Sequence, residues 1–144
     1  MATEILINDG GAPARILSPG KANVATESGL FVDINSSGKI IVGPDQEASQ
    51  SGQKRPLGIL AVDAVANGVT SVITGRGIVV NAQRLTGETL AAGDQLSVDA
   101  GGMLEKVSGA DFDAHNITAV ALGDGFTGTK ADGSAAYFVK VLLV

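Results

Sequence analysis

The sequence predicts an all-β protein, and three observations lead to this fold class. The apolar residues are mostly Val, Ile, Leu and Ala, whereas aromatic residues make up only 3% of the chain. The 20 glycines in 144 residues are about twice the average share. No stretch of about 11 or more residues repeats its apolar positions with the helical period. Short β-branched runs separated by Gly, Asn-Gly and Asp-Gly are typical of strands joined by tight turns.

The length of the chain indicates one domain. A chain of 144 residues buries roughly 70% of the surface that its unfolded state exposes, which is enough for a stable core. The chain has no cysteine, so thiol nucleophiles, thiolate metal sites and disulfides are excluded. We expect an extended N-terminal arm, residues 1–29, followed by a single β-rich body, residues 30–144.

The N-terminal region has two small apolar groups and little else. Thr3–Ile7 is a strand candidate, and Ile16-Leu17 lies just before Ser18-Pro19-Gly20. Because these groups carry too little apolar mass to hold the segment together, we expect an arm that pairs with another partner. The body is then expected to stay folded when residues 1–23 are deleted.

The body is predicted to consist of short strands in a regular series. Two hairpins are expected, one with its turn at Asn35-Ser36-Ser37-Gly38 and one with its turn at Ala100-Gly101-Gly102. A polar surface loop is expected from Pro44 to Lys54 and a long turn from Gly123 to Ser134. The expected strands are residues 30–34, 39–43, 56–62, 69–74, 78–80, 95–99, 103–107, 117–122 and 135–144.

A Gly-x-Gly pattern interrupts the apolar run in the middle of the chain. Gly75 and Gly77 flank Arg76, and glycines inside a strand pattern indicate a bulge or a sharp bend, where a sheet turns a corner. Arginine is enriched at the energetic centres of interfaces, so Arg76 is a candidate interface anchor. The competing interpretation is an exposed charge on a strand.

The charge of the chain argues against two classes of partner. The net charge is −5, and the densest basic spot is the pair Lys54-Arg55. Nucleic-acid binding needs a basic footprint, and an anionic membrane would weakly repel this chain. The first eight residues have no basic region before an apolar run, so we expect no signal peptide, and no apolar stretch reaches ~18 residues.

The sequence contains few groups that could perform chemistry. The single histidine, His115, follows Asp111 and Asp113 in a polar stretch. A calcium loop needs more oxygen ligands and a closing Glu, so an exposed loop is the expected structure. Asp99 and Glu105 could face each other across a hairpin, but a glycosidase site needs sugar-stacking aromatic residues, and the chain has no Trp.

The chain contains the glycine spacing of a nucleotide-binding motif without the secondary structure that such a motif requires. Residues 123–128 read Gly-x-Gly-x-x-Gly, but a dinucleotide site needs a helix after these glycines to hold the pyrophosphate, and turn residues follow instead. We therefore expect no catalytic residue, no cofactor and no metal, and a protein that is not an enzyme and works by binding a surface.

Three segments in order resemble one family. They are Gly58–Asp63, the run Leu90–Gly102 with Ala92-Gly93-Asp94, and Ala119–Asp124 with a terminal Val141-Leu142-Leu143. Together, over residues 56–144, they resemble the small capsid decoration (cement) proteins of tailed bacteriophages. The resemblance implies a compact β-barrel-like, β-tulip-like or sandwich body.

The resemblance also implies a function. Such a protein binds the major capsid protein on the outer surface of the expanded head, as a homotrimer at threefold and quasi-threefold positions, and stabilises the shell. Its location would be the virion, and the host cytoplasm during assembly. Alternatives from the residues are another structural virion component, either a head spike or a tail-associated β-domain, and a small-molecule-binding β-barrel. The candidate capsid or trimer interface residues are Ile5, Leu6, Ile7, Pro13, Arg15, Ile16, Leu17 and Arg76.

Overall fold

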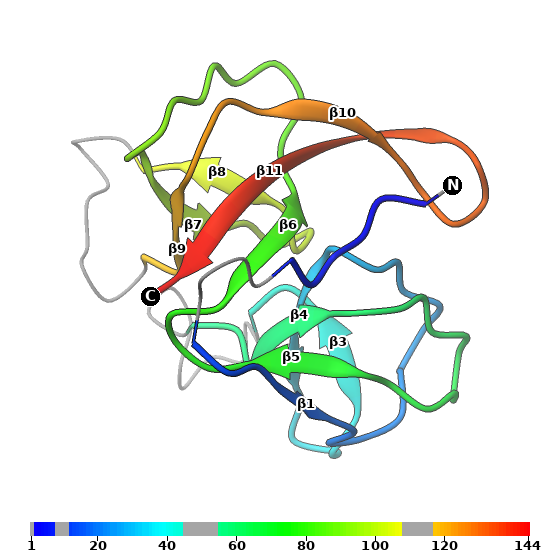
Figure 1. Cartoon of the computed structure of the whole chain (residues 1–144). Coiled ribbons are helices and arrows are strands. Elements are labelled where there is room, and N and C mark those ends of the chain that lie inside the picture. Colours follow the sequence, from blue (N-terminus) through cyan, green and yellow to red (C-terminus); the bar gives the residue numbers. More distant parts are fainter. Residues whose placement is uncertain (1, 8–11, 45–54, 108–116) are drawn as a thin grey trace.

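The computed structural model describes residues 2–7, 12–44, 55–107 and 117–144. Within these ranges the chain forms eleven strands and no helix, arranged as two antiparallel sheets that lie one above the other in Figure 1. The all-β prediction is therefore confirmed. Residues 45–54 of the expected polar loop, and the stretch with Asp111, Asp113 and His115, lie outside the described residues.

The first sheet has five strands and forms the lower half of Figure 1. The first predicted hairpin is confirmed in this sheet, with Ile34 opposite Ile40. Asn35 closes the turn, because its Oδ1 accepts the N–H groups of Ser37 and Lys39 at 3.0 and 2.9 Å. In spatial order the strands are β1 (Arg15–Leu17), β5 (Val72–Thr74), β4 (Gly58–Leu60), β2 (Phe31–Ile34) and β3 (Ile40–Val42).

The second sheet is built around one long strand, β11 (Ala135–Leu143). β10 (Phe126–Thr129) and β9 (Ala119–Ala121) follow one edge of β11, and β6 (Val79–Gln83) pairs with the other. β7 (Gln95–Val98) and β8 (Leu104–Lys106) extend the sheet beyond β9 and form the second predicted hairpin. The long turn predicted at 123–134 is wrong in part, because β10 forms there by pairing with β11.

Two hydrophobic cores hold the molecule together. The larger core collects buried side chains from both sheets, and the smaller lies on the opposite face of the first sheet. Successive residues of a strand point to opposite faces, so Phe31 and Ile59 enter the larger core while Val32 and Leu60 enter the smaller one. Strand β4 therefore has no polar side chain, as is common for strands buried on both faces, and Asp33 is the one polar residue of β2.

The predictions of a barrel and of an extended arm are corrected by the structure. The sheets are not closed into a barrel, and no N-terminal arm is shown. Ile5 and Ala22 are buried in the two cores, and Asn81 Nδ2 donates to the Glu4 oxygen at 2.9 Å. The segment needs little apolar mass of its own, because its few apolar side chains complete cores that the rest of the chain has built.

The strand predicted at Thr3–Ile7 is also corrected. Only Leu6 makes a bridge, opposite Val80, and Thr3 donates its N–H to the Thr129 oxygen at 2.7 Å. The segment follows sheet edges without forming a regular ladder.

The bend predicted at the Gly-x-Gly pattern is confirmed. The chain leaves the first sheet at Thr74 and enters the second at Val79. Gly75 and Gly77 have φ values of 128° and 75°, which L side chains rarely adopt. Among the described residues, the structure has no helix with the length and apolar character needed to cross a membrane.

Candidate interaction surface

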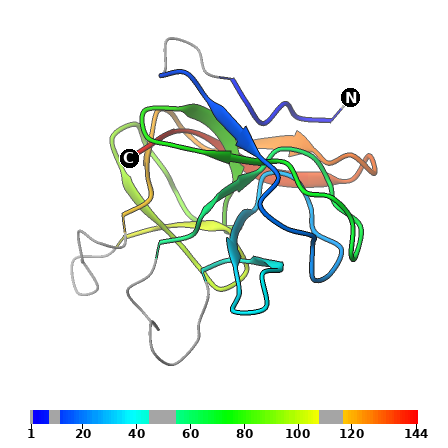
Figure 2. The same ribbon diagram turned by 90° about the horizontal axis from the view of Figure 1, so that it is seen from below.

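The exposed edge of the first sheet is the first part of the candidate surface. β1 pairs with β5 through Arg15 opposite Thr74, Ile16 opposite Ile73 and Leu17 opposite Val72. No strand that the structure describes pairs with its other edge, and Figure 2 shows β1 along the outside of the sheet. A free edge presents unpaired backbone groups that can template another strand.

The side chains of β1 are unusually apolar for such an edge. Ile16 and Leu17 are 56% and 45% exposed, although natural edge strands are commonly protected by charge or by proline. Local sequence explains why the strand is short, since Pro13 and Pro19 flank it and proline cannot donate to a ladder.

The turn between the sheets lies next to the start of this strand. Ala12 donates its N–H to the Gly77 oxygen at 2.7 Å, which places Pro13 and Arg15 close to the turn that carries Arg76. Pro13, Arg15 and Arg76 are all exposed. Five of the eight candidate residues therefore lie on one side of the molecule, which we call the β1 surface: Pro13, Arg15, Ile16, Leu17 and Arg76.

The other three candidate residues lie elsewhere and make internal contacts. Ile5 is only 5% exposed in the larger core. Leu6 is half-buried against that core, and Ile7 donates its N–H to the Val79 oxygen at 3.1 Å. In this structure these residues attach the N-terminal segment to β6 (Figure 1).

Sequence reasoning missed a group of exposed valines, which we call the valine loops. Val24, Val62, Val65 and Val69 are all more than half exposed. They lie on two segments joined by the bridges Lys21–Val69 and Thr26–Ala64. The one available signal was the position of Val65 and Val69 on either side of the Asn67-Gly68 turn.

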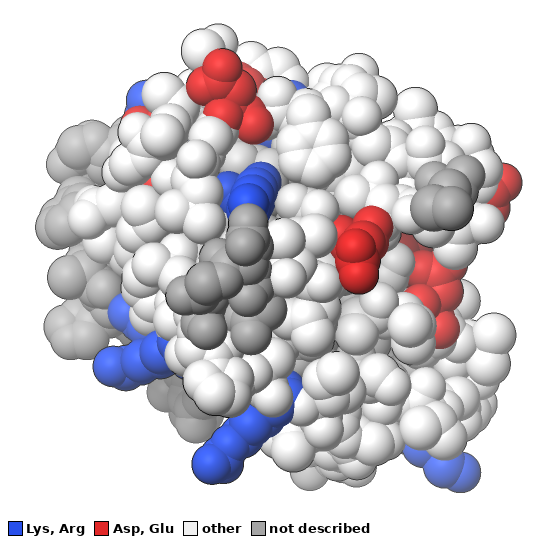
Figure 3. Space-filling view, viewed as in Figure 1, with Lys and Arg blue, Asp and Glu red and all other residues white. Residues whose placement is uncertain are grey.

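A second exposed apolar group lies on β10 and β11. The rings of Phe126 and Phe138 stack with centroids 6.0 Å apart, and Phe126 remains 37% exposed. The Arg84 guanidinium lies 5.4 Å from the centre of the Tyr137 ring. Figure 3 shows that uncharged surface predominates on the face viewed in Figure 1.

The two carboxylates that the sequence placed across a hairpin do not face each other. Asp99, one of the two carboxylates considered above, has an Oδ1 that accepts the N–H groups of Gly101 and Met103 at 2.9 Å each. It therefore holds the second hairpin turn. Glu105 lies opposite Ser97 and not opposite Asp99. Among the residues that the structure describes, no three His, Asp or Glu side chains cluster in a way that could hold a metal ion.

Comparison with known proteins adds no family. No protein-family model matches the chain, and no curated protein matches its sequence.

Proposed function

We propose that this protein is a capsid decoration (cement) protein of a tailed bacteriophage, which binds the major capsid protein on the outside of the expanded head. In this proposal it binds as a homotrimer at threefold and quasi-threefold positions, stabilises the shell and has no enzymatic activity. The resemblance over residues 56–144 supports the family. The observation that carries the proposal is the exposed aliphatic edge of β1.

The β1 surface suits a protein partner in two ways. A strand of the partner can add to the free edge of β1, so that main-chain hydrogen bonds supply affinity and side-chain pockets supply specificity. Burial of the exposed half of Ile16 or Leu17 would contribute about 1 kcal/mol each before association costs. Three such contacts in a trimer would act together at high effective concentration.

Co-sedimentation with expanded heads that lack this protein tests the proposal. We expect saturable binding, with three copies per threefold or quasi-threefold position and heads that become more resistant to heat. Absence of binding to expanded heads would contradict it. The protein would then be a spike or tail component if mature virions contain it elsewhere, and a small-molecule-binding protein if they lack it.

A pair of matched variants tests the surface. Ile16→Lys places a charge on the edge of β1, and Val65→Lys places the same charge on a still more exposed aliphatic residue of the valine loops. We expect Ile16→Lys to weaken head binding by tenfold or more, and Val65→Lys to change it by less than threefold. The reverse result would show that the valine loops, and not the edge of β1, contact the head. Circular dichroism melting checks that both variants fold.

A further inference from the structure

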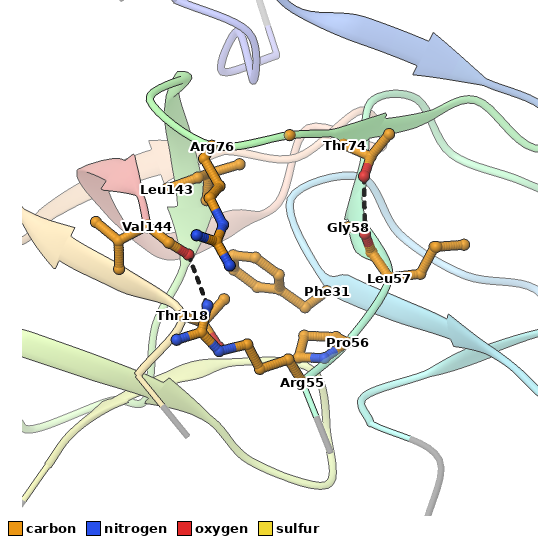
Figure 4. Close-up of a pocket in the computed structure, with 11 residues that line it drawn as sticks. Phe31, Arg55, Pro56, Leu57, Gly58, Thr74, Arg76, Thr118, Leu143 and Val144 are labelled. Atoms are coloured by element: carbon orange, nitrogen blue, oxygen red, sulfur yellow. Dashed lines mark hydrogen bonds between the residues drawn. The ribbon is translucent and has the colours of Figure 1, made fainter. Parts of the chain in front are cut away.

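A pocket at the junction of the two sheets contains two arginines. Its volume is about 280 Å³, and its walls come from the start of β4, the turn after β5, the residue before β9 and the end of β11 (Figure 4). Phe31 contributes an apolar wall. Among the described residues, none of those that line the pocket is an Asp or a Glu.

The chain directs the two arginines into this pocket from separate segments. Arg55 lies just before β4, and its Nη1 donates to the main-chain oxygen of Val144 at 2.9 Å. Arg76 lies in the turn between the sheets, where the Gly77 N–H donates to the Leu143 oxygen at 2.7 Å. In Figure 4 the Arg76 side chain points into the pocket, toward the side on which Arg55 lies.

Arg76 has no partner of its own among the described residues. It makes no hydrogen bond or ion pair there, either with the Val144 oxygen or with any side chain.

Guanidinium groups in this arrangement suit one kind of ligand. The planar fork of an arginine matches the two oxygens of a carboxylate or phosphate and forms short, charge-assisted hydrogen bonds with them. We propose that the pocket between Arg55 and Arg76 binds an oxyanion, either a free small anion or an acidic side chain of a docked protein. This inference depends on the pocket alone and does not require the function proposed above.

The first experiment titrates the isolated full-length protein with inorganic phosphate at constant ionic strength. It follows the Nε–Hε signals of the arginines by NMR. We expect saturable shifts at Arg76 and Arg55. Arg76→Gln, which removes an exposed side chain without described contacts, should weaken the phosphate affinity measured at Arg55 by tenfold or more. Arg15→Gln, an exposed arginine of β1, is the matched control and should leave the affinity within twofold.

Two results would overturn the inference. Shifts that grow without saturation, and to the same extent at Arg15, would show general charge screening. An unchanged affinity in Arg76→Gln would show that the two arginines do not form one site. A glutarate titration in place of phosphate identifies whether the pocket takes carboxylates as well.

The second experiment distinguishes the sources of the anion with the expanded heads. Arg55→Gln is used here because Arg55 lies outside the β1 surface. If an acidic side chain of the shell occupies the pocket, Arg55→Gln will weaken head binding and phosphate will compete with the heads. If the ligand is a free anion, Arg55→Gln will bind heads as the unaltered protein does, although its phosphate binding is weakened. Failure of the unaltered protein to bind heads would contradict the proposed function and leave the phosphate titration as the test of the pocket.

Discussion

Gly43 lies where two segments of the backbone touch. Its φ is 74°, and a Cβ at this position would lie 2.6 Å from the Ala100 oxygen. Its N–H donates to the Phe31 oxygen at 2.8 Å within the first hairpin, and its approach to Ala100 joins that hairpin to the turn of the second. Both the positive φ of Gly43 and the nearby backbone of Ala100 therefore disfavour any residue with a side chain at this position.

Gly38 offers a matched control for this position. Its φ is 77°, and a Cβ there would meet nothing within 4 Å. We expect Gly38→Ala to lower the free energy of unfolding by about 1–2 kcal/mol through conformation alone. Gly43→Ala should cost about 1–3 kcal/mol more because of the clash. Urea denaturation measures both, and equal losses would show that the backbone contact adds nothing.

The ionisation of Asp94 makes the stability of the second sheet depend on pH. Its Oδ2 accepts the Ala91 N–H at 3.0 Å and lies 3.4 Å from the Lys106 Nζ. The hydrogen bond from Ala91, helped by Lys106, lowers the pKa of Asp94 below its ordinary value. The stabilisation is therefore fully present above the unfolded carboxyl pKa of about 3.9 and is lost as the pH falls through the lower folded pKa.

An NMR titration of the Asp94 carboxyl checks this effect. We expect its pKa to lie below the ordinary range and to rise in Lys106→Gln without returning fully, since the Ala91 hydrogen bond remains. The stability difference between the protein and Asp94→Asn should shrink as the pH falls below about 4. A difference that stays constant down to the folded pKa would contradict the coupling.

At the scale of elements, the N-terminal segment behaves as part of the body. Ile5 belongs to the larger core, Ala22 to the smaller, and β1 completes the edge of the first sheet. These contacts conflict with the expectation that the body stays folded when residues 1–23 are deleted. Deletion of residues 1–23 should lower the free energy of unfolding of the rest of the chain.

Single substitutions separate an arm from an integrated segment. Ile5→Ala should lower the free energy of unfolding by about 2–5 kcal/mol, as truncation of a buried aliphatic side chain does. Ile16→Ala, at a side chain that is 56% exposed, should change it by about 0.5 kcal/mol or less. Guanidinium denaturation measures both changes. If Ile5→Ala leaves the free energy of unfolding unchanged, the N-terminal segment is an arm that does not contribute to the stability of the body.

At the scale of the whole molecule, the larger core makes the two sheets one unit. Phe31 and Ile59 from the first sheet pack there with Val80 and Val141 from the second. Because neither sheet keeps this core without the other, we expect unfolding in a single cooperative transition.

Two probes test this cooperativity. Tyr137, the single tyrosine, reports on β11 by fluorescence, and far-ultraviolet circular dichroism reports on both sheets. Phe31→Ala should cost about 3–5 kcal/mol and should shift the midpoints of both probes together. A fluorescence midpoint that stays in place while the other moves would show that the sheets unfold separately.

The sequence by itself determined the fold class, both hairpins, the strand β11 and the bend at Gly75 and Gly77. Each of these depends on neighbours in the chain: turn residues between apolar runs, or glycines that allow a conformation other residues avoid. The sequence also indicated eight interface candidates, from the composition of the N-terminal segment and from the glycines around Arg76. Five of them lie at the β1 surface, whereas Ile5, Leu6 and Ile7 contact the rest of the chain.

Only the tertiary structure decided which of the candidate residues face solvent and where the chain meets itself. Ile5 and Ile16 look alike in sequence, yet one is buried and the other exposed. β10 is a strand because β11 lies beside it, and the two arginines of the pocket are brought together by the meeting of the sheets. Burial and pairing depend on partners far along the chain, and no local pattern contains that information.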